Sequence, residues 1–509
     1  MKTSRRTLLG AVGLAGLSAT ALTGCFSDNG SSGSAKTPGT ERLKIASLSA
    51  PKASLSPFSD DAYRLFRWSA IECLTILDDE GKPQPSLATG WEQRSDTEWV
   101  FTLRDGVTFH DGTAFDAETA VNSLAKVMAA SPLPRVLAGV QLTASAEDGK
   151  LVITTAAPDP LLPNRVSSPN LCMLAPSAYG AETVDPIGHG SGAFVVTKLN
   201  GTANASLDRY EGYWGDRPLL AGIEDTFVPD GTSRASALRT GEADIAEALP
   251  IGQLDEIEEG LVHEIPNSRT TALYLNTSSG VFTDPAVRAA AREAVDTKQI
   301  VEKVFEGHAD PAAEMLSDAL NWPAEARKRV GFENLLSSRA KASSDLNGKS
   351  IKLATYTDRP ELPEIATQLE QAFKAAGFTV EQTVREYTYL SEEILSGAFD
   401  AVILSRSMTI DSGDPVSTLA SDFTSSGSFN IAMLKDPEVD SLVSRAGAIE
   451  PGQDRQDAVI RAEAAILALD AVIPLVHERT LQGEASGVSD AARDNLERRL
   501  VTTKTDVTR

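Results

Sequence analysis

The chain has 509 residues, too many for a single hydrophobic core, so two or three lobes are expected. Its content of 41% hydrophobic and 23% charged residues is that of an ordinary water-soluble protein. The formal charge of −24 disfavours nucleic acid and anionic lipid surfaces as partners of the folded body.

The first residues have the pattern of an export signal rather than of a folded element. Lys2, Arg5 and Arg6 form a basic start, and the apolar stretch 8–22 is too short for a lasting membrane span. Residues 4–9 resemble a twin-arginine signal, which indicates export of the folded protein. The general secretory route is the alternative.

A lipid anchor is predicted at Cys25. The segment Leu22-Thr23-Gly24-Cys25 matches the lipobox, the bacterial lipoprotein cleavage site whose cysteine thiol accepts a diacylglycerol. The alternative is a plain secretory signal with a chance cysteine. Residues 26–40, rich in Ser and Gly, are then a flexible tether. Removal of the first 24 residues, which hold three basic and no acidic side chains, leaves a formal charge of −27.

We expect no cofactor, no metal site and no catalysis. After Cys25, only Cys73 and Cys172 remain, and they form either a disulfide or two buried, unbridged side chains. The five histidines have no metal-ligand spacing, and no CxxC motif is present. The common hydrolase, metalloprotease and P-loop motifs are also missing, so the sequence favours a binding protein over an enzyme.

The first third of the chain predicts short strands and one capped helix. Residues 98–104 alternate between apolar and polar, and with 107–109 they predict an antiparallel meander between Asp-Gly turns. Residues 142–156 predict a further hairpin. Asp116 is expected to cap a helix between these segments. The buried stripe of that helix is predicted to be Val121, Leu124, Ala125 and Met128.

The second half predicts a βαβ unit and a long helix. Residues 351–356 and 378–384 read as strands, joined by a helix that ends at Gly377. A crossover between parallel strands is expected to be right-handed. One continuous helix is predicted from the cap at Asp284 to Gly307. The buried face of the crossover helix is predicted to be Ile365, Leu369, Phe373 and Ala376.

The stretch 401–404 is apolar at every position, which predicts a parallel strand covered on both faces. Loops 357–360 and 406–415 follow strands of this unit, and open α/β sheets bind ligands beyond such strand ends. Charged side chains in these loops suit a small polar ligand, while ordinary turn chemistry is the alternative. These side chains are Asp358, Arg359, Asp411 and Asp414.

A series of motifs runs in order through about residues 43–480. Together they resemble the dipeptide/oligopeptide/nickel-binding family of extracellular solute-binding proteins, which are the ligand receptors of ABC importers. Any one motif is weak, but their order along the whole chain is specific. They lie at 85–91, 99–118, 186–194, 213–218, 228–234, 238–246, 273–276, 287–300 and 473–477.

The resemblance implies an α/β fold of the periplasmic-binding-protein type. It has two lobes with mixed, doubly wound sheets, a hinge of two strands and an extra subdomain on the first lobe. We expect lobe I to comprise 41–66, 181–267 and 476–509. The extra subdomain is placed at 67–180 and lobe II at 268–475.

The resemblance also implies site residues. In dipeptide-binding members, an aspartate in a Gly-Asp-Asn-Gly-Asp-Pro loop binds the α-amino group of the ligand. Residues 410–415 match both aspartates, the glycine and the proline of that loop, so Asp411 is the expected amine contact, with Asp414 beside it. The family's carboxylate-binding arginine corresponds to a position near Tyr356. Arg359, three residues on, is the candidate here, with a surface role at a helix start as the alternative.

Trp68, on the segment that enters the extra subdomain, is a further cleft candidate. Nickel-binding members share this scaffold, but the chain departs from one of them at two positions. Val416 stands in place of a histidine, and Cys172 stands in place of an arginine. Both departures weaken the metal interpretation.

We therefore expect an extracytoplasmic, lipid-anchored and monomeric receptor. It would capture di- or oligopeptides between its lobes and deliver them to the permease and ATPase subunits of an importer. A receptor for nickel or another metal chelate is the alternative. A surface lipoprotein without a transport role and a hydrolase are further alternatives.

Overall fold

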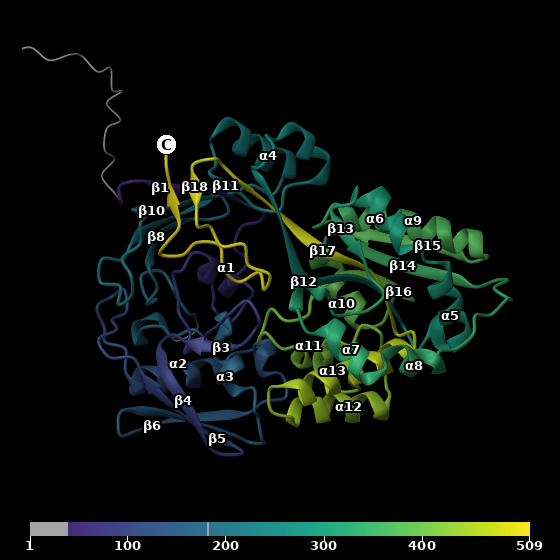
Figure 1. The fold of residues 1–509 in the computed structure, drawn as a ribbon, viewed down its shortest axis with the longest axis horizontal. Helices are drawn as coiled ribbons and strands as arrows, with labels where there is room; N and C mark the ends of the chain where they lie inside the picture. The colour runs from purple at the N-terminus through teal and green to yellow at the C-terminus, as the bar shows by residue number, and fades with distance from the viewer. Residues whose placement is uncertain (1–38, 181–182) are drawn as a thin grey trace, which may run out of the picture. The chain divides into compact units, whose positions relative to one another are not determined.

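The computed structural model describes residues 39–180 and 183–509 (Figure 1). The predicted signal, the lipid site at Cys25 and most of the tether lie outside the described residues. Within the described ranges, no helix is both long enough and apolar enough to cross a membrane.

The elements are as follows. The strands are β1 (Arg42–Ser47), β2 (Thr75–Leu77), β3 (Pro83–Pro85), β4 (Ala88–Ser95), β5 (Glu98–Leu103), β6 (Leu142–Glu147), β7 (Lys150–Thr155), β8 (Phe194–Asn200), β9 (Asn204–Arg209), β10 (Gly222–Phe227), β11 (Ile245–Ala246), β12 (Val262–Leu275), β13 (Ala309–Pro311), β14 (Ser350–Tyr356), β15 (Thr379–Arg385), β16 (Ala401–Ser407), β17 (Val472–Glu484), β18 (Val488–Ser489) and β19 (Asp506–Val507). The helices are α1 (Asp61–Arg67), α2 (Ala117–Met128), α3 (Leu162–Arg165), α4 (Gly231–Thr240), α5 (Pro285–Ala294), α6 (Thr297–Val304), α7 (Pro323–Val330), α8 (Phe332–Leu335), α9 (Glu361–Ala376), α10 (Tyr387–Leu395), α11 (Val416–Phe423), α12 (Pro437–Ala448) and α13 (Gln453–Ala468).

One mixed sheet extends through both lobes in the order β15-β14-β16-β12-β17-β11-β1-β10-β9-β8, with β13 beside β17. β12 and β17 are its long antiparallel pair, and their pairing is interrupted by a register shift between Pro266 and Thr270. On one side of that shift, the next strand in the sheet is β16, which pairs with β12. On the other side, the next strand is β11, which pairs with β17. These two strands are therefore the connection between the lobes.

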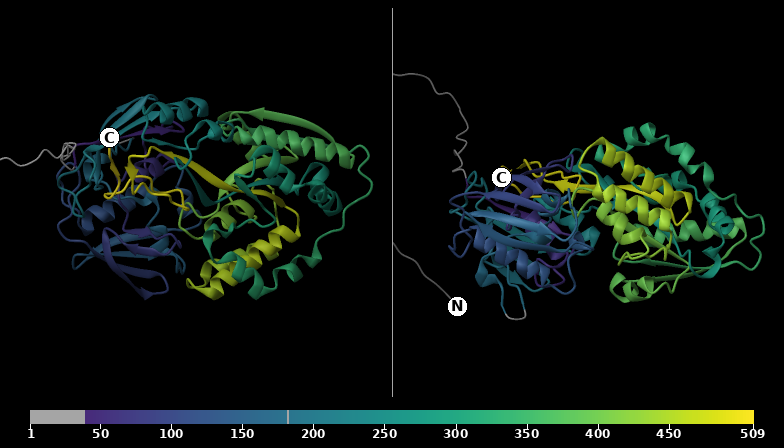
Figure 2. Two further views of the ribbon diagram at one scale, coloured as in Figure 1. Left: turned by 45° about the horizontal axis from the view of Figure 1, so that its top comes forward. Right: turned by 90° about the horizontal axis from the view of Figure 1, so that it is seen from below.

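The buried apolar side chains form three large clusters. The lobe II core is drawn from residues 272–476. The lobe I core is drawn from 43–73, 172–245 and 500–507. The third, the small-sheet core, is drawn from 74–175, and it lies between the four-stranded sheet β4-β5-β7-β6 and α2. Figure 2 shows this small sheet with α2 on one face.

Local signals explain where several elements begin and end. Asp116 accepts a hydrogen bond from the backbone of Thr119 at 2.9 Å and caps α2. Gly241 and Gly377 end α4 and α9 with φ of 74° and 109°, a left-handed conformation that glycine adopts without a Cβ clash. β14 and β15 are parallel and are joined by α9, which confirms the predicted βαβ unit.

Two predictions of local structure were wrong, and a third was right for only one of two neighbouring strands. Residues 107–109 form no strand; β5 pairs with β4 and β7 instead. The continuous helix from 284 to 307 is split into α5 and α6, because Val295 is extended and Asp296 begins a new helix by accepting from the backbone of Gln299. The strand β16 is parallel to β14 but antiparallel to β12, so its apolar run reports burial and not strand direction.

The predicted stripe of α2 was also only partly right. Leu124 is buried, but Ala125 is exposed, and Ser123 and Val127 take the buried positions next to it. The buried face of α2 therefore differs from the predicted one. Both faces of the helix carry small or apolar residues, so periodicity alone did not define which face is buried.

Candidate functional site

The loop between β16 and α11 is held from several directions. Gly413 donates its backbone N–H to Thr409 at 2.7 Å, which closes the turn. Asp414 accepts from the backbone of Val416 at 2.9 Å and pairs with Arg455 at 2.7 Å. The Arg455 side chain is only 3% exposed, so this pair anchors the start of α11 against α13. Asp414 therefore fixes the loop that presents Asp411.

Asp411 lies at a contact between lobe I, the small-sheet subdomain and lobe II. Tyr63 of α1 donates its hydroxyl to the carboxylate at 2.6 Å. Arg135, at the start of the short helix η1 (Arg135–Leu137), donates through Nε and Nη2, each at 3.3 Å. Asp411 is only 6% exposed. Residues far apart in sequence thus meet on one carboxylate.

The charge of Asp411 is set by these partners. Burial acts to raise the pKa of its carboxyl, but the Arg135 guanidinium and the Tyr63 hydroxyl outweigh burial and hold the pKa below its ordinary value. Burial, together with the charge of this carboxylate, raises the pKa of Tyr63. Asp411 is therefore an ionised acceptor whose present cationic partner, Arg135, keeps 35% of its side chain exposed.

Arg406 lies close enough to Asp411 to lower the pKa of its carboxyl, and aromatic rings lie near Arg406. Arg406 of β16 pairs with Asp422 through two hydrogen bonds of 2.8 and 2.7 Å and lies 4.3 Å from the ring centre of Phe429. Tyr356 and Tyr387 form an edge-to-face pair with ring centres 5.4 Å apart.

The structure pairs Arg359, whose side chain is 27% exposed, with the connecting strand β17. It donates to Glu478 of β17 at 2.7 Å and lies 3.5 Å from Glu361. Glu478 also accepts from Thr271 at 2.6 Å and from Ser405 at 2.5 Å. No described contact joins Arg359 to Asp411, so the structure does not itself bring these two predicted site residues together.

Trp68 lies in the lobe I core and is 1% exposed. Its indole donates to Asp225 at 2.8 Å. Burial raises the pKa of Asp225 to about 7. In this conformation the ring of Trp68 is covered, and a ligand contact by Trp68 stays a prediction.

Sequence reasoning missed Tyr63, Arg135 and Asn164. Their separations from the loop at Asp411 are 348, 276 and 248 positions, so no local motif connects them to it.

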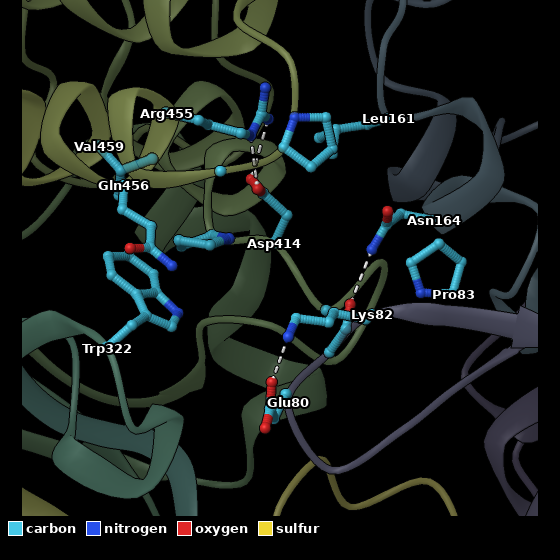
Figure 3. A pocket seen from close by; sticks show the side chains of 15 residues that line it. Glu80, Lys82, Pro83, Leu161, Asn164, Trp322, Asp414, Arg455, Gln456 and Val459 are labelled. Carbon is cyan, nitrogen blue, oxygen red and sulfur yellow. Dashed lines mark hydrogen bonds and ion pairs between the residues drawn. The ribbon is translucent and has the colours of Figure 1, made fainter. Parts of the chain in front are cut away.

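A cavity of about 340 Å³ lies on the Asp414 side of the loop (Figure 3). One wall comes from the β2–β3 turn and α3, and the other comes from lobe II, including Trp322 and the start of α13. In Figure 3, the pair of Asp414 with Arg455 lies at one end and the pair of Lys82 with Glu80 lies at the other.

Two further observations concern cysteines and metals. Cys73 and Cys172 are both buried free thiols, so the structure has them unbridged. In the part of the chain that is described, no group of three or more His, Cys, Asp or Glu side chains is arranged to hold a metal ion.

Comparison with known proteins identifies the family. The model of the bacterial extracellular solute-binding proteins, family 5 Middle, matches residues 82–430. The nickel-binding protein NikA of Staphylococcus aureus is 26% identical over 408 residues, which cover 78% of this chain and 81% of that protein. The glutathione-binding protein GsiB of Pectobacterium atrosepticum is 25% identical over 430 residues, covering 77% and 80%.

The fold has solved counterparts. The dipeptide-binding protein from Pseudoalteromonas sp. SM9913, solved in complex with Met-Leu, is similar with a TM-score of 0.78. The match covers 92% of this chain and 100% of that chain at 16% identity, which shows likeness of fold. The predicted two-lobed architecture is confirmed. The chain belongs to the bacterial extracellular solute-binding proteins of family 5, the extracytoplasmic receptors that supply solutes to ABC importers.

Proposed function

We propose that this receptor captures di- or oligopeptides between its two lobes and delivers them to the permease of an importer. The observation that carries the proposal is the ionised, nearly buried carboxylate of Asp411, held at the contact between the lobes. A carboxylate in such a position pairs strongly with an ammonium group that has lost its water. The α-amine of a peptide is a cation of this kind.

Arg135 is the group that a peptide amine would replace. Its hydrogen bonds to Asp411 are long, at 3.3 Å, whereas charge-assisted bonds are usually 2.7–2.9 Å. Arg135 also lies 3.5 Å from Asp60, which can keep the guanidinium paired after an exchange. The cost of displacing Arg135 is therefore small compared with that of leaving a buried charge alone.

The other predicted site residues have supporting or secondary roles in this proposal. Arg359 is the proposed partner of a ligand carboxylate, since a guanidinium can bind Glu478 and a second carboxylate at once. Asp414 holds the loop through Arg455, and Trp68 holds Asp225.

A receptor for a metal chelate is the second candidate. It is favoured by the similarity to the nickel-binding protein of Staphylococcus aureus. Arg135 and Arg406 would then hold carboxylates of the chelating molecule, so the metal would be cargo.

The test is native mass spectrometry of the purified full chain with defined probes. The probes are an equimolar mixture of L-dipeptides, a tripeptide mixture, glutathione, nickel(II) alone and nickel(II) with L-histidine. The proposal expects peptide adducts at micromolar concentrations. Adducts with nickel and histidine but with no peptide would replace it by the metal-chelate alternative.

We also propose that the protein is anchored by lipid at Cys25. Cys25→Ala should release the protein from the membrane fraction or leave the precursor uncleaved, because the thiol is the group that accepts the lipid. Detergent partitioning and the mass of the N-terminal peptide measure this. Ser32→Ala, in the same segment, is the matched control. Unchanged partitioning of Cys25→Ala would contradict a lipid anchor.

A further inference from the structure

Two glycines from different lobes lie backbone against backbone. Gly81 is in the β2–β3 turn beside the small-sheet core, and Gly413 is in the loop that carries Asp411. A Cβ built on Gly81 would lie 2.8 Å from the carbonyl oxygen of Gly413. A Cβ on Gly413 would lie 2.6 Å from Leu77 Cδ1 and 2.8 Å from the carbonyl oxygen of Gly81. Because Cβ atoms do not approach other heavy atoms so closely, neither position accepts a side chain in this conformation.

One amide group joins the same two loops. Asn164 of α3 donates through Nδ2 to the carbonyl oxygen of Gly81 at 2.9 Å and to that of Ser412 at 3.0 Å. Its side chain lies at one wall of the cavity in Figure 3. Asn164 is 5% exposed, so both bonds are made away from bulk water, where an unpaired donor is costly.

We propose that Gly81, Asn164 and Gly413, called here the closure clasp, set how far the two lobes close over the ligand. The clasp rests on the proposed capture of a ligand between the lobes. Ser412, which accepts from Asn164, is the direct neighbour of Asp411. The clasp therefore fixes the distance of Asp411 from Tyr63 and Arg135 on the opposite side. Its members are positioning residues, since they act on the ligand through Asp411.

The chain offers a matched control for the glycine contact. Gly81 and Gly112 both belong to the small-sheet region and have φ of +77° and +85°, so alanine strains the backbone at either position. A Cβ at Gly112 meets nothing within 4 Å, whereas at Gly81 it meets Gly413. A difference between Gly81→Ala and Gly112→Ala therefore measures the contact and not the backbone strain.

Asn164→Asp is the second variant, and it does not alter the backbone. It has the same shape as asparagine but turns a carboxylate oxygen toward two carbonyl oxygens, which removes both bonds and adds repulsion. Asn122→Asp, on α2 in the same subdomain, controls for the added charge. Asn164→Asp keeps the proposal testable if Gly81→Ala fails to fold.

The experiment uses the full chain without ligand and with the equimolar mixture of L-dipeptides. Amide exchange of segments 77–83 and 409–415 is followed by mass spectrometry, and the radius of gyration by small-angle scattering. We expect exchange in both segments to be at least about threefold faster in Gly81→Ala and Asn164→Asp than in wild type and the controls. We also expect a larger radius of gyration for these two variants in at least one of the two conditions.

If Gly81→Ala and Asn164→Asp match their controls in exchange and in radius of gyration under both conditions, the clasp proposal is wrong. If wild type binds no dipeptide while the exchange difference remains, the clasp stands and the peptide proposal fails. If dipeptides bind wild type while exchange and the radius of gyration are the same in wild type and these variants, the peptide proposal stands and the clasp fails.

Discussion

Asp411→Ala should weaken ligand binding by roughly 30-fold to several thousand-fold. Truncation of one member of a buried charge pair costs roughly 2–5 kcal/mol, because the partner is left desolvated and alone. Each tenfold change in affinity corresponds to about 1.4 kcal/mol. Asp411 is only 6% exposed, so its charge is little screened by water and the full range applies.

The fold should survive this substitution. Asp411 is a loop residue, and Asp414 with Arg455 still anchors the loop when the Asp411 carboxylate is gone. Arg135 keeps Asp60 within 3.5 Å and can turn toward water. We therefore expect the melting temperature of the ligand-free protein to change by a few degrees at most, of the order expected for about 1 kcal/mol.

Calorimetry with the peptide selected by native mass spectrometry measures the loss. Asp255→Ala, at an exposed carboxylate of lobe I, is the control for a lost negative charge. A loss below about threefold, with an unchanged melting temperature, would mean that Asp411 is only a turn residue.

Arg135→Gln separates the two candidate functions. If a peptide amine replaces Arg135, removing this competing cation should leave affinity unchanged or increase it. If Arg135 holds carboxylates of a metal chelate, the same substitution should weaken binding. The two variants, Asp411→Ala and Arg135→Gln, therefore move affinity in opposite directions only for a cationic ligand.

The free energy of unfolding of wild type should depend on pH through Glu72 by about 3 kcal/mol, and Glu72→Gln should lose this dependence. Glu72 accepts hydrogen bonds from Ser191 at 2.9 Å, Tyr213 at 3.0 Å and Trp214 at 3.0 Å. Burial raises the pKa of its carboxyl to about 7 from an ordinary value of 4.5, although these donors act in the opposite direction. Folding therefore retains a proton on Glu72 that the unfolded chain loses.

The sign follows from this proton. Below pH 4.5 both states hold it, and the contribution of Glu72 to stability is fully present. Between pH 4.5 and about 7 only the folded state holds it, so stability falls as the pH rises. One pKa unit corresponds to 1.36 kcal/mol, so the window gives about 3 kcal/mol. Glutamine at this position carries no such proton.

Urea unfolding followed by tryptophan fluorescence at pH 4.5, 6 and 8 measures the difference between wild type and Glu72→Gln. Other titrating groups cancel because they are present in both proteins. Glu118→Gln, an exposed change on α2, is the matched control. If the difference in unfolding free energy between wild type and Glu72→Gln stays constant within about 1 kcal/mol over this range of pH, Glu72 is ionised in the folded protein.

The sequence alone predicted elements whose signals are local. The βαβ unit, the caps at Asp116 and Asp284 and the glycine stop at Gly377 depend on residues within one or two turns. The motif order predicted the two-lobed fold because the motifs span the whole chain. The break between α5 and α6 was missed, since the apolar spacing continues across Val295 and only the backbone there leaves the helix.

The site shows the same division between local and distant signals. The loop with Asp411 was found because its residue pattern is contiguous, and Asp414 accepts from the backbone of Val416 as turn chemistry predicts. Arg359 was predicted as a cationic site residue. Its partner Glu478 lies 119 positions away, so the sequence did not predict which carboxylate Arg359 contacts. Trp68 was expected near the cleft, whereas its indole donates to Asp225 inside the lobe I core.

The sequence by itself determined the family and the two-lobed fold through short motifs in order along the chain, and it determined the loop that carries Asp411 through one contiguous pattern. Only the tertiary structure decided which groups meet that loop. Tyr63, Arg135 and Asn164 reach it from lobe I and the small-sheet subdomain. Side chains so distant along the chain become neighbours only through the packing of separate cores, which no local pattern of charge or hydrophobicity records.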